Sequence, residues 1–535
     1  MNKLMLTALV AMAGCTAQGQ PGEPVGTARQ AETAQPGELR NLPKLRYVTP
    51  GSTGGSGGGG AGGGGATDAW QPLQNQPASI YAGTALLLTD GSVMVQDAGS
   101  SNWWKLQPDA TGSYVAGTWK QLASMTDGYA PLYFASAVLA DGRVIVEGGE
   151  YQNFEPTWTT KGAIYDPVAD AWTAIAPPAG WQTIGDAQSA VLADGRFLLA
   201  DCCSTNSALL DQKNLTWTAF GKGKADMFDE EGWTLLPNGK LLTVDANLPN
   251  NLTASEIFAP STGTWTSAGS TIVQLPDTDP DNGGSHELGP VLLRPDGTAF
   301  AAGATGHSAI YHAWSGKWTA GPDFPVVAGE GPLDVADGPA SLLPDGRVLV
   351  VASAGVFNTP AHFLVFDGRA FSEVAAPPGA VYDSSYNVNL LPLPNGQILM
   401  TDFSNDVEIF TPSGKPRCGW EPVVERSCAL ESLTPGKTYR VTGERLNGLS
   451  QAQSYGDDVQ AATNYPLVRI TNQKSGHVVY ARTHNHSSMS VNANTRSSTF
   501  FDVPATIEAG ASELVVVANG IASQPIDVQV ESVIP

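Results

Sequence analysis

The feature that most constrains the fold of this chain is a strand–turn–strand pattern that recurs along its middle. In each copy, two or three apolar residues lead into a turn that ends in Asp-Gly or Asn-Gly, and another apolar run follows. Glycine adopts the positive φ that such a tight turn requires, so these dipeptides predict β-hairpins. The seven turn glycines are Gly91, Gly142, Gly195, Gly239, Gly297, Gly346 and Gly396.

A second marker predicts how the repeats assemble. An aromatic residue opens a further strand after each of the first six turns: Trp119, Trp172, Trp217, Trp265, Trp318 and Phe371. Four strands in about 50 residues match the kelch period and the blade of a β-propeller. The seventh repeat lacks its aromatic strand, but residues 69–73, with Trp70, precede the first repeat. We expect this N-terminal strand to complete the last blade, which removes a free sheet edge.

The chain is therefore predicted to be all-β, with a seven-bladed propeller over residues 68–415 and a C-terminal β-sandwich over residues 416–535. Short apolar runs without blade markers indicate the sandwich. Cys418 and Cys428 flank the junction, and a disulfide between them would contribute about 3 kcal/mol on the chain-entropy model. The adjacent Cys202 and Cys203 form either a vicinal disulfide or two buried thiols.

The N-terminal residues indicate export. Residues 1–14 contain a short apolar run after Lys3, which is typical of a signal peptide, and small residues directly precede Cys15. We expect Cys15 to be lipidated; the alternative is ordinary cleavage after a small residue. Residues 15–67 then form a flexible, Gly-rich tether. The expected location is the outer membrane or cell surface, otherwise the periplasm or the medium, with membrane contact through the lipid anchor only.

Charge and composition exclude two other classes of protein. Apolar residues make up 42% of the chain and charged residues 15%, so the chain is not intrinsically disordered. The formal net charge of −23 argues against a nucleic-acid partner, because phosphate binding requires a surplus of Lys and Arg. No later apolar run is long enough to predict a transmembrane helix.

Polar side chains are expected where the innermost strand of each blade begins, at one mouth of the central channel. Positions nine or ten residues before the turn glycines carry phenols, carboxylates and an amide: Tyr81, Tyr133, Asp186, Glu230, Glu287, Asp337, Tyr386 and Asn387. Glu231 is one step away from this offset and is taken as the site residue of its blade. Polar groups that converge on a cavity predict a binding site. The alternative is that these are ordinary polar loop residues.

Over residues 68–535, the seven repeats, the N-terminal closing strand and the trailing sandwich resemble the galactose oxidase and glyoxal oxidase family of copper radical oxidases. That resemblance implies an early-set, immunoglobulin-like C-terminal domain. It implies that Tyr133 corresponds to the Tyr that is cross-linked to Cys, and Tyr386 to the axial Tyr. It also implies that His486, beside His484, is the histidine from a C-terminal loop. The stretch 448–469 is similar to that of bacterial kelch-type proteins.

Two positions depart from the copper site of that family. Ala82 stands where the cross-linking Cys is expected, and Asn387 where a His follows the axial Tyr. An amide is a poor Cu(II) ligand beside imidazole, so a working radical oxidase is disfavoured. The preferred hypothesis is a module that binds a glycan or another hydroxyl-rich ligand through the ring-mouth residues, with His484 and His486.

The alternative hypothesis is a metal-dependent oxidase with a rebuilt site. Its ligands would be His486 and Tyr386, with His484 and a ring carboxylate, Glu231 or Asp337, as further donors. Such a set could hold copper, manganese or calcium. The sequence by itself assigns no cofactor and no catalytic residue.

Overall fold

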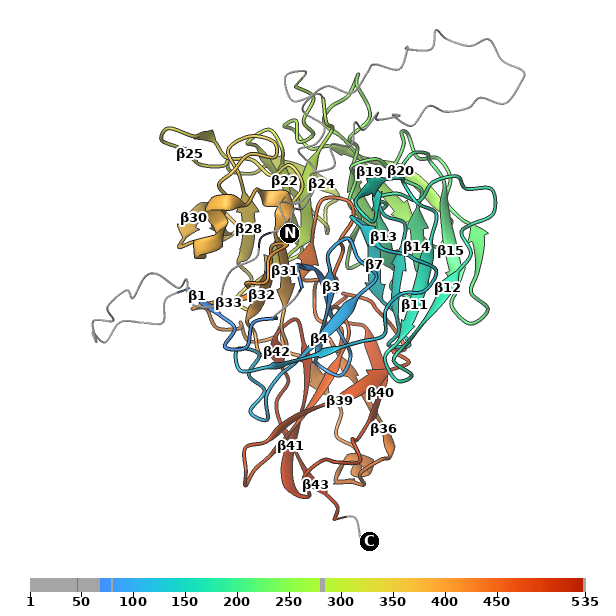
Figure 1. The fold of residues 1–535 in the computed structure, drawn as a ribbon, viewed down its shortest axis with the longest axis vertical. Coiled ribbons are helices and arrows are strands. Elements are labelled where there is room, and N and C mark those ends of the chain that lie inside the picture. Colours follow the sequence, from blue (N-terminus) through green and yellow to red (C-terminus); the bar gives the residue numbers. More distant parts are fainter. Residues whose placement is uncertain (1–45, 47–67, 78–79, 280–283, 533–535) are drawn as a thin grey trace, which may run out of the picture.

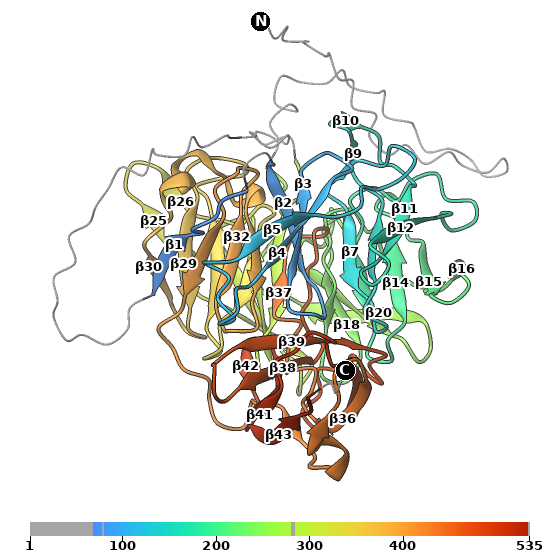
Figure 2. The same cartoon turned by 60° about the horizontal axis from the view of Figure 1, so that its bottom comes forward.

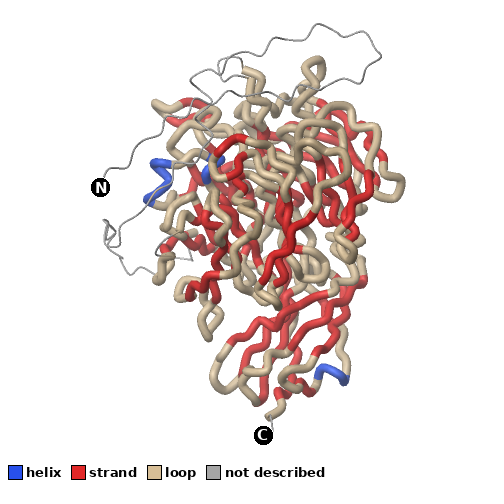
Figure 3. The backbone as a smooth tube through the Cα atoms, turned by 45° about the vertical axis from the view of Figure 1, so that its right-hand side comes forward, coloured by secondary structure: helices blue, strands red, loops and turns tan. Residues whose placement is uncertain are grey.

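The computed structural model describes residues 46, 68–77, 80–279 and 284–532. These residues form β-sheets in which nearly all strand pairs are antiparallel, with a few short 3-10 turns: η3 (Pro378–Tyr382), η4 (Ser385–Asn387) and η5 (Cys428–Leu430). Figure 3 shows strands alternating with loops and turns, with only a few short helical turns. No helix in the described ranges is long and apolar enough to cross a membrane.

Sheets of one repeated design, which we call blades, are arranged around a central channel, because the inner strands of neighbouring blades contact one another. Figures 1 and 2 show the blades above the C-terminal strands. Blade 1 contains β2 (Ala82–Leu87), β3 (Val93–Asp97), β4 (Trp103–Gln107) and β5 (Thr118–Gln121). Blade 2 contains β7 (Ala135–Val138), β8 (Val144–Glu147), β11 (Gly162–Asp166) and β12 (Ala171–Ile175). Blade 3 contains β13 (Ser189–Val191), β14 (Phe197–Ala200), β15 (Ser207–Asp211) and β16 (Thr216–Ala219).

The next blades repeat this order of strands. Blade 4 contains β17 (Thr234–Leu235), β18 (Leu241–Val244), β19 (Ala254–Ala259) and β20 (Thr264–Ser270). Blade 5 contains β21 (Leu288–Leu293), β22 (Thr298–Gly303), β23 (Ser308–His312) and β24 (Lys317–Ala320). Blade 6 contains β27 (Ala340–Leu342), β28 (Val348–Ala352), β29 (His362–Phe366) and β30 (Phe371–Val374). Small additional ladders are formed by β6 (Pro131–Leu132), β9 (Tyr151–Gln152) and β10 (Glu155–Pro156), and by β25 (Val326–Val327) and β26 (Gly331–Pro332).

Blade 7 is closed by the N-terminal strand, as predicted. It contains β31 (Asn389–Pro392), β32 (Ile398–Thr401), β33 (Glu408–Thr411) and β1 (Ala69–Pro72). Trp70 on β1 is paired with Phe410 on β33, and their ring centroids lie 4.9 Å apart. The two ends of the propeller sequence therefore meet in one sheet, which joins the last blade to the first part of the chain.

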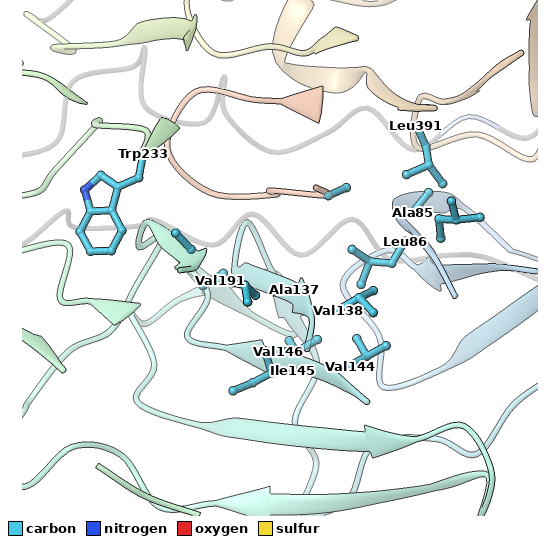
Figure 4. Packing of buried hydrophobic residues seen from close by; sticks show 14 of the residues in the cluster. Ala85, Leu86, Ala137, Val138, Val144, Ile145, Val146, Val191, Trp233 and Leu391 are labelled. Atoms are coloured by element: carbon cyan, nitrogen blue, oxygen red, sulfur yellow. The ribbon is translucent and has the colours of Figure 1, made fainter. Parts of the chain in front are cut away.

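Apolar side chains and outer-strand indoles hold neighbouring blades together. Figure 4 shows Leu86 of β2 with Val138 of β7 and Leu391 of β31, which belong to one buried cluster. The outer-strand Trp172 donates its indole N–H to the carbonyl of Ala123, at 2.9 Å, which lies just beyond the preceding blade. The recurrent aromatic in the sequence is therefore an inter-blade contact as well as a strand marker.

The C-terminal strands form one curved sheet below the propeller, coloured orange to red in Figures 1 and 2. They are β34 (Val423–Val424), β35 (Ser432–Leu433), β36 (Thr438–Glu444), β38 (Leu467–Asn472), β39 (Val478–His484), β40 (Arg496–Asp502), β41 (Gly510–Ala518), β42 (Ile521–Ala522) and β43 (Ile526–Val530). One end of β39 pairs with β38 and the other with β40, so the sheet turns around a shared apolar core that includes Val441, Phe501 and Leu514.

One part of the C-terminal region leaves this sheet and enters the propeller. We call residues 450–463 the channel segment. Its strand β37 (Gln453–Ser454) pairs with β27 on the channel side of blade 6. Ser136 of blade 2 donates its hydroxyl to the Gln460 carbonyl at 2.9 Å. On the other side, the Tyr455 hydroxyl donates to the carbonyl of Tyr386 at 2.6 Å. The segment is buried along nearly all of its length, so it fills the channel.

The cysteines differ in part from expectation. Cys202 and Cys203 form a vicinal disulfide, which decides between the two alternatives that the sequence left open. The expected Cys418–Cys428 disulfide was wrong, since both are exposed free cysteines. Trp420, close to Cys418, packs on the blade 6 turn at Gly346, whereas Cys428 begins η5 of the C-terminal region. The chain on the two sides of the junction is thus held by different parts of the fold.

The predicted signal peptide, Cys15 and almost all of the predicted tether lie outside the described residues. Arg46 is the one described position within the predicted tether. Its guanidinium pairs with Asp383 at 3.0 Å and with Asp402 at 2.5 Å, and its backbone forms a bridge with Ser404. Two carboxylates of the blade 7 region therefore hold this position against the propeller.

Candidate functional site

A repeated backbone kink places side chains at one mouth of the channel. Tyr133, Glu230, His286 and Asp337 all have φ between 48° and 65°, each just before the inner strand of its blade. Non-glycine residues in this left-handed region cost about 1–3 kcal/mol each and persist only where the surrounding fold enforces them. The kink turns the chain at the rim, so the residue itself or its neighbour reaches the channel axis.

A small, partly open cavity of about 40 Å³ lies at this mouth. Its lining residues are Tyr133, Glu150, Asp186, Glu230, Glu287, Asp337, Phe357, Tyr386, Asp457 and Asp458. A water molecule requires roughly 10–15 Å³ of such volume. The cavity therefore has room for a hydrated ion or for a protruding hydroxyl group, and it is too small for a sugar ring.

The part of the lining that the structure describes carries many carboxylates and no basic side chain that would neutralise their charge. We call its seven carboxylates the mouth cluster: Glu150, Asp186, Glu230, Glu287, Asp337, Asp457 and Asp458. No lysine, arginine or histidine is among the described residues that line the cavity, although His286 lies close to the neighbouring Asp229. Oxygen atoms of Glu230, Glu287 and Asp337, from three successive blade entries, all lie within 4.8 Å of one another.

Several of these oxygens have no hydrogen-bond partner. Both carboxylate oxygens of Asp458 are buried and unpartnered, and the residue is only 1% exposed. One oxygen each of Asp186, Glu287, Asp337 and Asp457 is also buried without a partner. Buried polar atoms are nearly always hydrogen-bonded in proteins, so this set of free acceptors indicates a place for a ligand.

Burial and mutual repulsion hinder ionisation of the cluster. Burial, reinforced by the charges of Asp229 and Asp337, raises the pKa of Asp186 to about 8. Burial raises the pKa of Asp337 to about 7 despite a hydrogen bond with Glu287. Burial also holds the pKa values of the other members well above their usual range, with neighbouring carboxylates adding to the effect. The cluster therefore has a strong tendency to bind protons or a cation.

The structure brings together five of the residues that the sequence singled out: Tyr133, Asp186, Glu287, Asp337 and Tyr386. Tyr81 packs against the same aromatic group beside the cavity. Asn387 is next to the cavity but has a local role, since its side-chain oxygen accepts a hydrogen bond from the Ser384 N–H at the start of η4. Burial raises the pKa of Tyr386 to about 12, and a hydrogen bond with Asn387 partly offsets this rise.

The assignment of Glu231 to the mouth was wrong. Its carboxylate lies 3.1 Å from the Lys224 ammonium, inside blade 4. The left-handed kink at Glu230, where φ is 60°, separates the directions of the two side chains, so the channel side chain is Glu230 and not Glu231. Although burial opposes it, the surrounding carboxylates raise the pKa of Lys224 above its ordinary value.

The assignment of His486 and His484 to this site was also wrong. The backbone N–H of His486 donates a hydrogen bond to the carbonyl of Ala140. Ala140 lies at the far end of β7 from Tyr133. Seven residues of extended chain span roughly 23 Å, so His486 and Tyr386 cannot share a metal ion. Burial lowers the pKa of His486 to about 3, and His484 lies 3.3 Å from Asp502 in the C-terminal sheet.

Sequence reasoning missed the contribution of the channel segment. Asp457 and Asp458 reach the mouth from the C-terminal region, between blades that are distant in sequence. One signal was present: these are the only charged residues between Arg445 and Arg469. An isolated acidic pair in an otherwise uncharged run indicates a buried segment with a specific polar role. Glu150 and Phe357 were missed as well, because loops outside the repeated offset supply them.

Comparison with known proteins supports the architecture. No protein-family model matches the chain. It is 33% identical over 94 residues to the Kelch-like protein terF of Aspergillus terreus, a match covering 17% of this chain and 20% of that protein. The chain thus spans about a fifth of that relative. The repeated four-stranded sheets show a propeller-type fold, and this match makes one part of the chain similar to a kelch-like protein.

Solved structures with similar folds are distant in sequence. One is a fungal alcohol oxidase of the AA5 family in complex with copper, with 15% identity and a TM-score of 0.48, covering 88% of this chain and 100% of that one. Another is the virginiamycin B lyase of Staphylococcus aureus, with 10% identity and a TM-score of 0.42, covering 64% of this chain and 99% of that one.

The donors at the mouth do not fit a copper radical centre. Tyr133 and Tyr386 are in place, but Ala82 offers no thiol and the channel segment presents Asp457 and Asp458 in place of an imidazole. Copper(II) sites favour imidazole nitrogen, whereas carboxylate and phenol oxygens suit harder cations. The residues of this mouth therefore support no copper-based step.

Proposed function

We propose that this protein is an exported kelch-like propeller that binds a hydroxyl-rich ligand, such as a glycan, at the channel mouth, without a copper radical cofactor. The observation that carries the proposal is the set of buried, unpartnered carboxylate oxygens that face the cavity, foremost those of Asp458. Hydroxyl groups are donors that such acceptors lack, and a buried acceptor that stays without a partner costs about 1–3 kcal/mol.

The cavity also limits how a ligand can bind. Its volume of about 40 Å³ admits a terminal hydroxyl or hydroxymethyl group but excludes a ring. The body of the ligand would lie over the rim, where Phe357 packs edge-on against Tyr386 with ring centroids 5.2 Å apart. Aromatic faces offer apolar contact area at low entropic cost, and the phenol hydroxyls of Tyr133 and Tyr386 add hydrogen-bonding groups.

Binding to an array of immobilised oligosaccharides tests this proposal. Asp458→Asn and Tyr386→Phe each remove one polar function from the mouth and leave nearly the same volume. We expect each to weaken binding of the array ligand about 10-fold, as expected for the loss of one hydrogen bond to the ligand. A matched control is His484→Gln, in the C-terminal sheet. Unchanged binding in both mouth variants, or an equal loss in the control, would contradict the proposed site.

We also propose that the protein is anchored in the cell envelope through a lipid on Cys15. The apolar run and the small residues before Cys15 support this proposal. Cells given labelled palmitate should incorporate it into the wild-type protein and not into Cys15→Ala. Equal labelling of the two proteins, or no labelling of either, would contradict the proposed lipid anchor on Cys15.

A further inference from the structure

We propose that the mouth cluster holds a hard divalent cation of the calcium type, with Glu230, Glu287 and Asp337 as its protein ligands and Asp457 and Asp458 beside them. This inference rests on the proposed function, because the ion would occupy the same cavity and present its open coordination positions to the hydroxyls of the ligand. Nothing in the resemblance to copper oxidases implies such a site.

The first observation is the convergence of three carboxylates. Glu230 precedes blade 4, Glu287 precedes blade 5 and Asp337 precedes blade 6, yet their oxygens lie within 4.8 Å of one another. Like charges at this separation repel strongly in a buried site, and only protons or a cation relieve the repulsion. The propeller thus brings three elements of the chain to one point where their charges require a counter-ion.

The second observation is that the protein leaves acceptors free around this point. Asp458 is 1% exposed, and both of its oxygens lack a hydrogen-bond partner. Glu287 and Asp337 each have one further free oxygen. Glu287 shares hydrogen bonds with Glu230 and Asp337, but these bonds leave the oxygens just named without a partner. Free lone pairs that face a cavity are what a cation accepts from its ligands.

Blade 4 contains an internal comparison. Four buried carboxylates gather there as well, but the Lys224 ammonium lies among them, 3.1 Å from Glu231, 3.2 Å from Asp245 and 2.9 Å from Glu256. Asp226 completes that set. In blade 4 the buried carboxylates therefore have a lysine of the chain itself as their counter-ion. The mouth cluster has no such residue in its described lining, so its counter-ion must come from solution.

The oxygen ligands and the volume of the cavity indicate which class of cation can bind. Calcium takes six to eight oxygen ligands in flexible geometry, often including carboxylates and water, whereas magnesium requires near-ideal octahedral geometry. The oxygen-only lining and the volume of about 40 Å³ suit a calcium ion that retains some water. Zinc and copper favour nitrogen and sulfur donors, which this cavity does not offer.

Calorimetric titration of the mature protein tests the inference. The protein is stripped with EDTA and desalted, then titrated separately with CaCl2, MnCl2 and ZnCl2 in the absence of any sugar. We expect one calcium site per chain, a weaker or equal response to manganese, and at least a 10-fold loss of calcium affinity in the double variant Glu287→Gln/Asp337→Asn. The control Asp323→Asn removes the same kind of charge at an exposed position that faces only His307, and it should bind calcium like the wild type.

Thermal unfolding separates loss of the site from loss of the fold. The double variant removes two repelling charges, so without calcium it should unfold at a temperature equal to or above that of the wild type. With calcium, the wild type alone should gain stability, because an ion that binds only the native state stabilises it. No calcium binding by the wild type, or equal binding by the double variant, would overturn the inference.

The same samples distinguish the cation from the glycan proposal. If the array ligand binds in EDTA and the protein shows no calcium site, the cation inference fails and the proposed function stands. If calcium binds at the mouth and no oligosaccharide binds with calcium present, the cation site stands and the glycan proposal fails. If oligosaccharide binding requires calcium and is lost in Glu287→Gln/Asp337→Asn, both are supported.

Discussion

Raising the pH from 4 to 8 in the absence of divalent cations should destabilise the protein through its mouth cluster. The folded-state pKa of Asp186 is raised from 3.8 to about 8 and that of Asp337 from 3.8 to about 7, chiefly by burial. Between the unfolded and folded pKa values, the native state binds more protons than the unfolded chain. The stability linked to these protons is fully present below about pH 4 and is lost as the pH rises through the folded pKa values.

The size of this effect follows from the shifts. One pKa unit corresponds to about 1.4 kcal/mol, so the shift of about three units at Asp337 corresponds to a loss on the order of 4 kcal/mol. Asp186 alone would contribute on the order of 6 kcal/mol by the same conversion. Neighbouring carboxylates titrate as a coupled set and not one by one, so the values do not simply add. The expected total of several kcal/mol is a large share of the stability of a typical domain.

Urea unfolding followed by tryptophan fluorescence, at a series of pH values in EDTA, measures the loss. Other buried acids and His362 also titrate, so the decisive quantity is the difference between the wild type and Glu287→Gln/Asp337→Asn. We expect the unfolding free energy of the wild type to fall more steeply with pH than that of the variant, and saturating calcium to flatten the wild-type curve. Parallel curves for the two proteins in EDTA would refute the electrostatic account of the cluster.

Further predictions concern the fold around the site. Lys224→Met should lower the unfolding free energy by about 3–5 kcal/mol in urea titrations, because it leaves buried carboxylates without their cation; wild-type stability would contradict this role. Trp70→Ala should cost about 2–4 kcal/mol in the same assay, because its half-buried ring packs between two phenylalanines at the closure of blade 7. A loss below 1 kcal/mol would show that closure depends on backbone pairing alone. Iodoacetamide in denaturant without reductant should leave the vicinal pair unlabelled and label the free thiols; the four cysteines concerned are Cys202, Cys203, Cys418 and Cys428.

The propeller could be predicted from the sequence because its signals are local and repeated. Each Asp-Gly or Asn-Gly turn predicts its own hairpin. Because the pattern recurs many times, a wrong assignment of one turn does not change the predicted fold. The closing strand at Trp70 was predictable because a marker missing at one end of the repeats was present at the other. The pairing of Trp70 with Phe410 confirms that interpretation.

The site was only partly predictable, because its geometry depends on backbone direction and on contacts between distant segments. A kink with φ of 60° turns Glu230 toward the channel and leaves Glu231 to Lys224, a difference of one residue that spacing cannot resolve. Asp458 reaches the mouth only because the channel segment threads the ring. His486 matched a family motif in sequence, but the fold holds it against Ala140 on the opposite face.

The most direct test of the account is a crystal structure of the mature protein grown with MnCl2 and soaked with an oligosaccharide selected on the array, with anomalous diffraction recorded for manganese. The account predicts an anomalous peak among the carboxylates of Glu230, Glu287 and Asp337, with a ligand hydroxyl beside it and the ligand body over the rim at Phe357. A cavity that contains only ordered water, with ion or oligosaccharide bound elsewhere on the molecule, would contradict the claim that the channel mouth is the functional site.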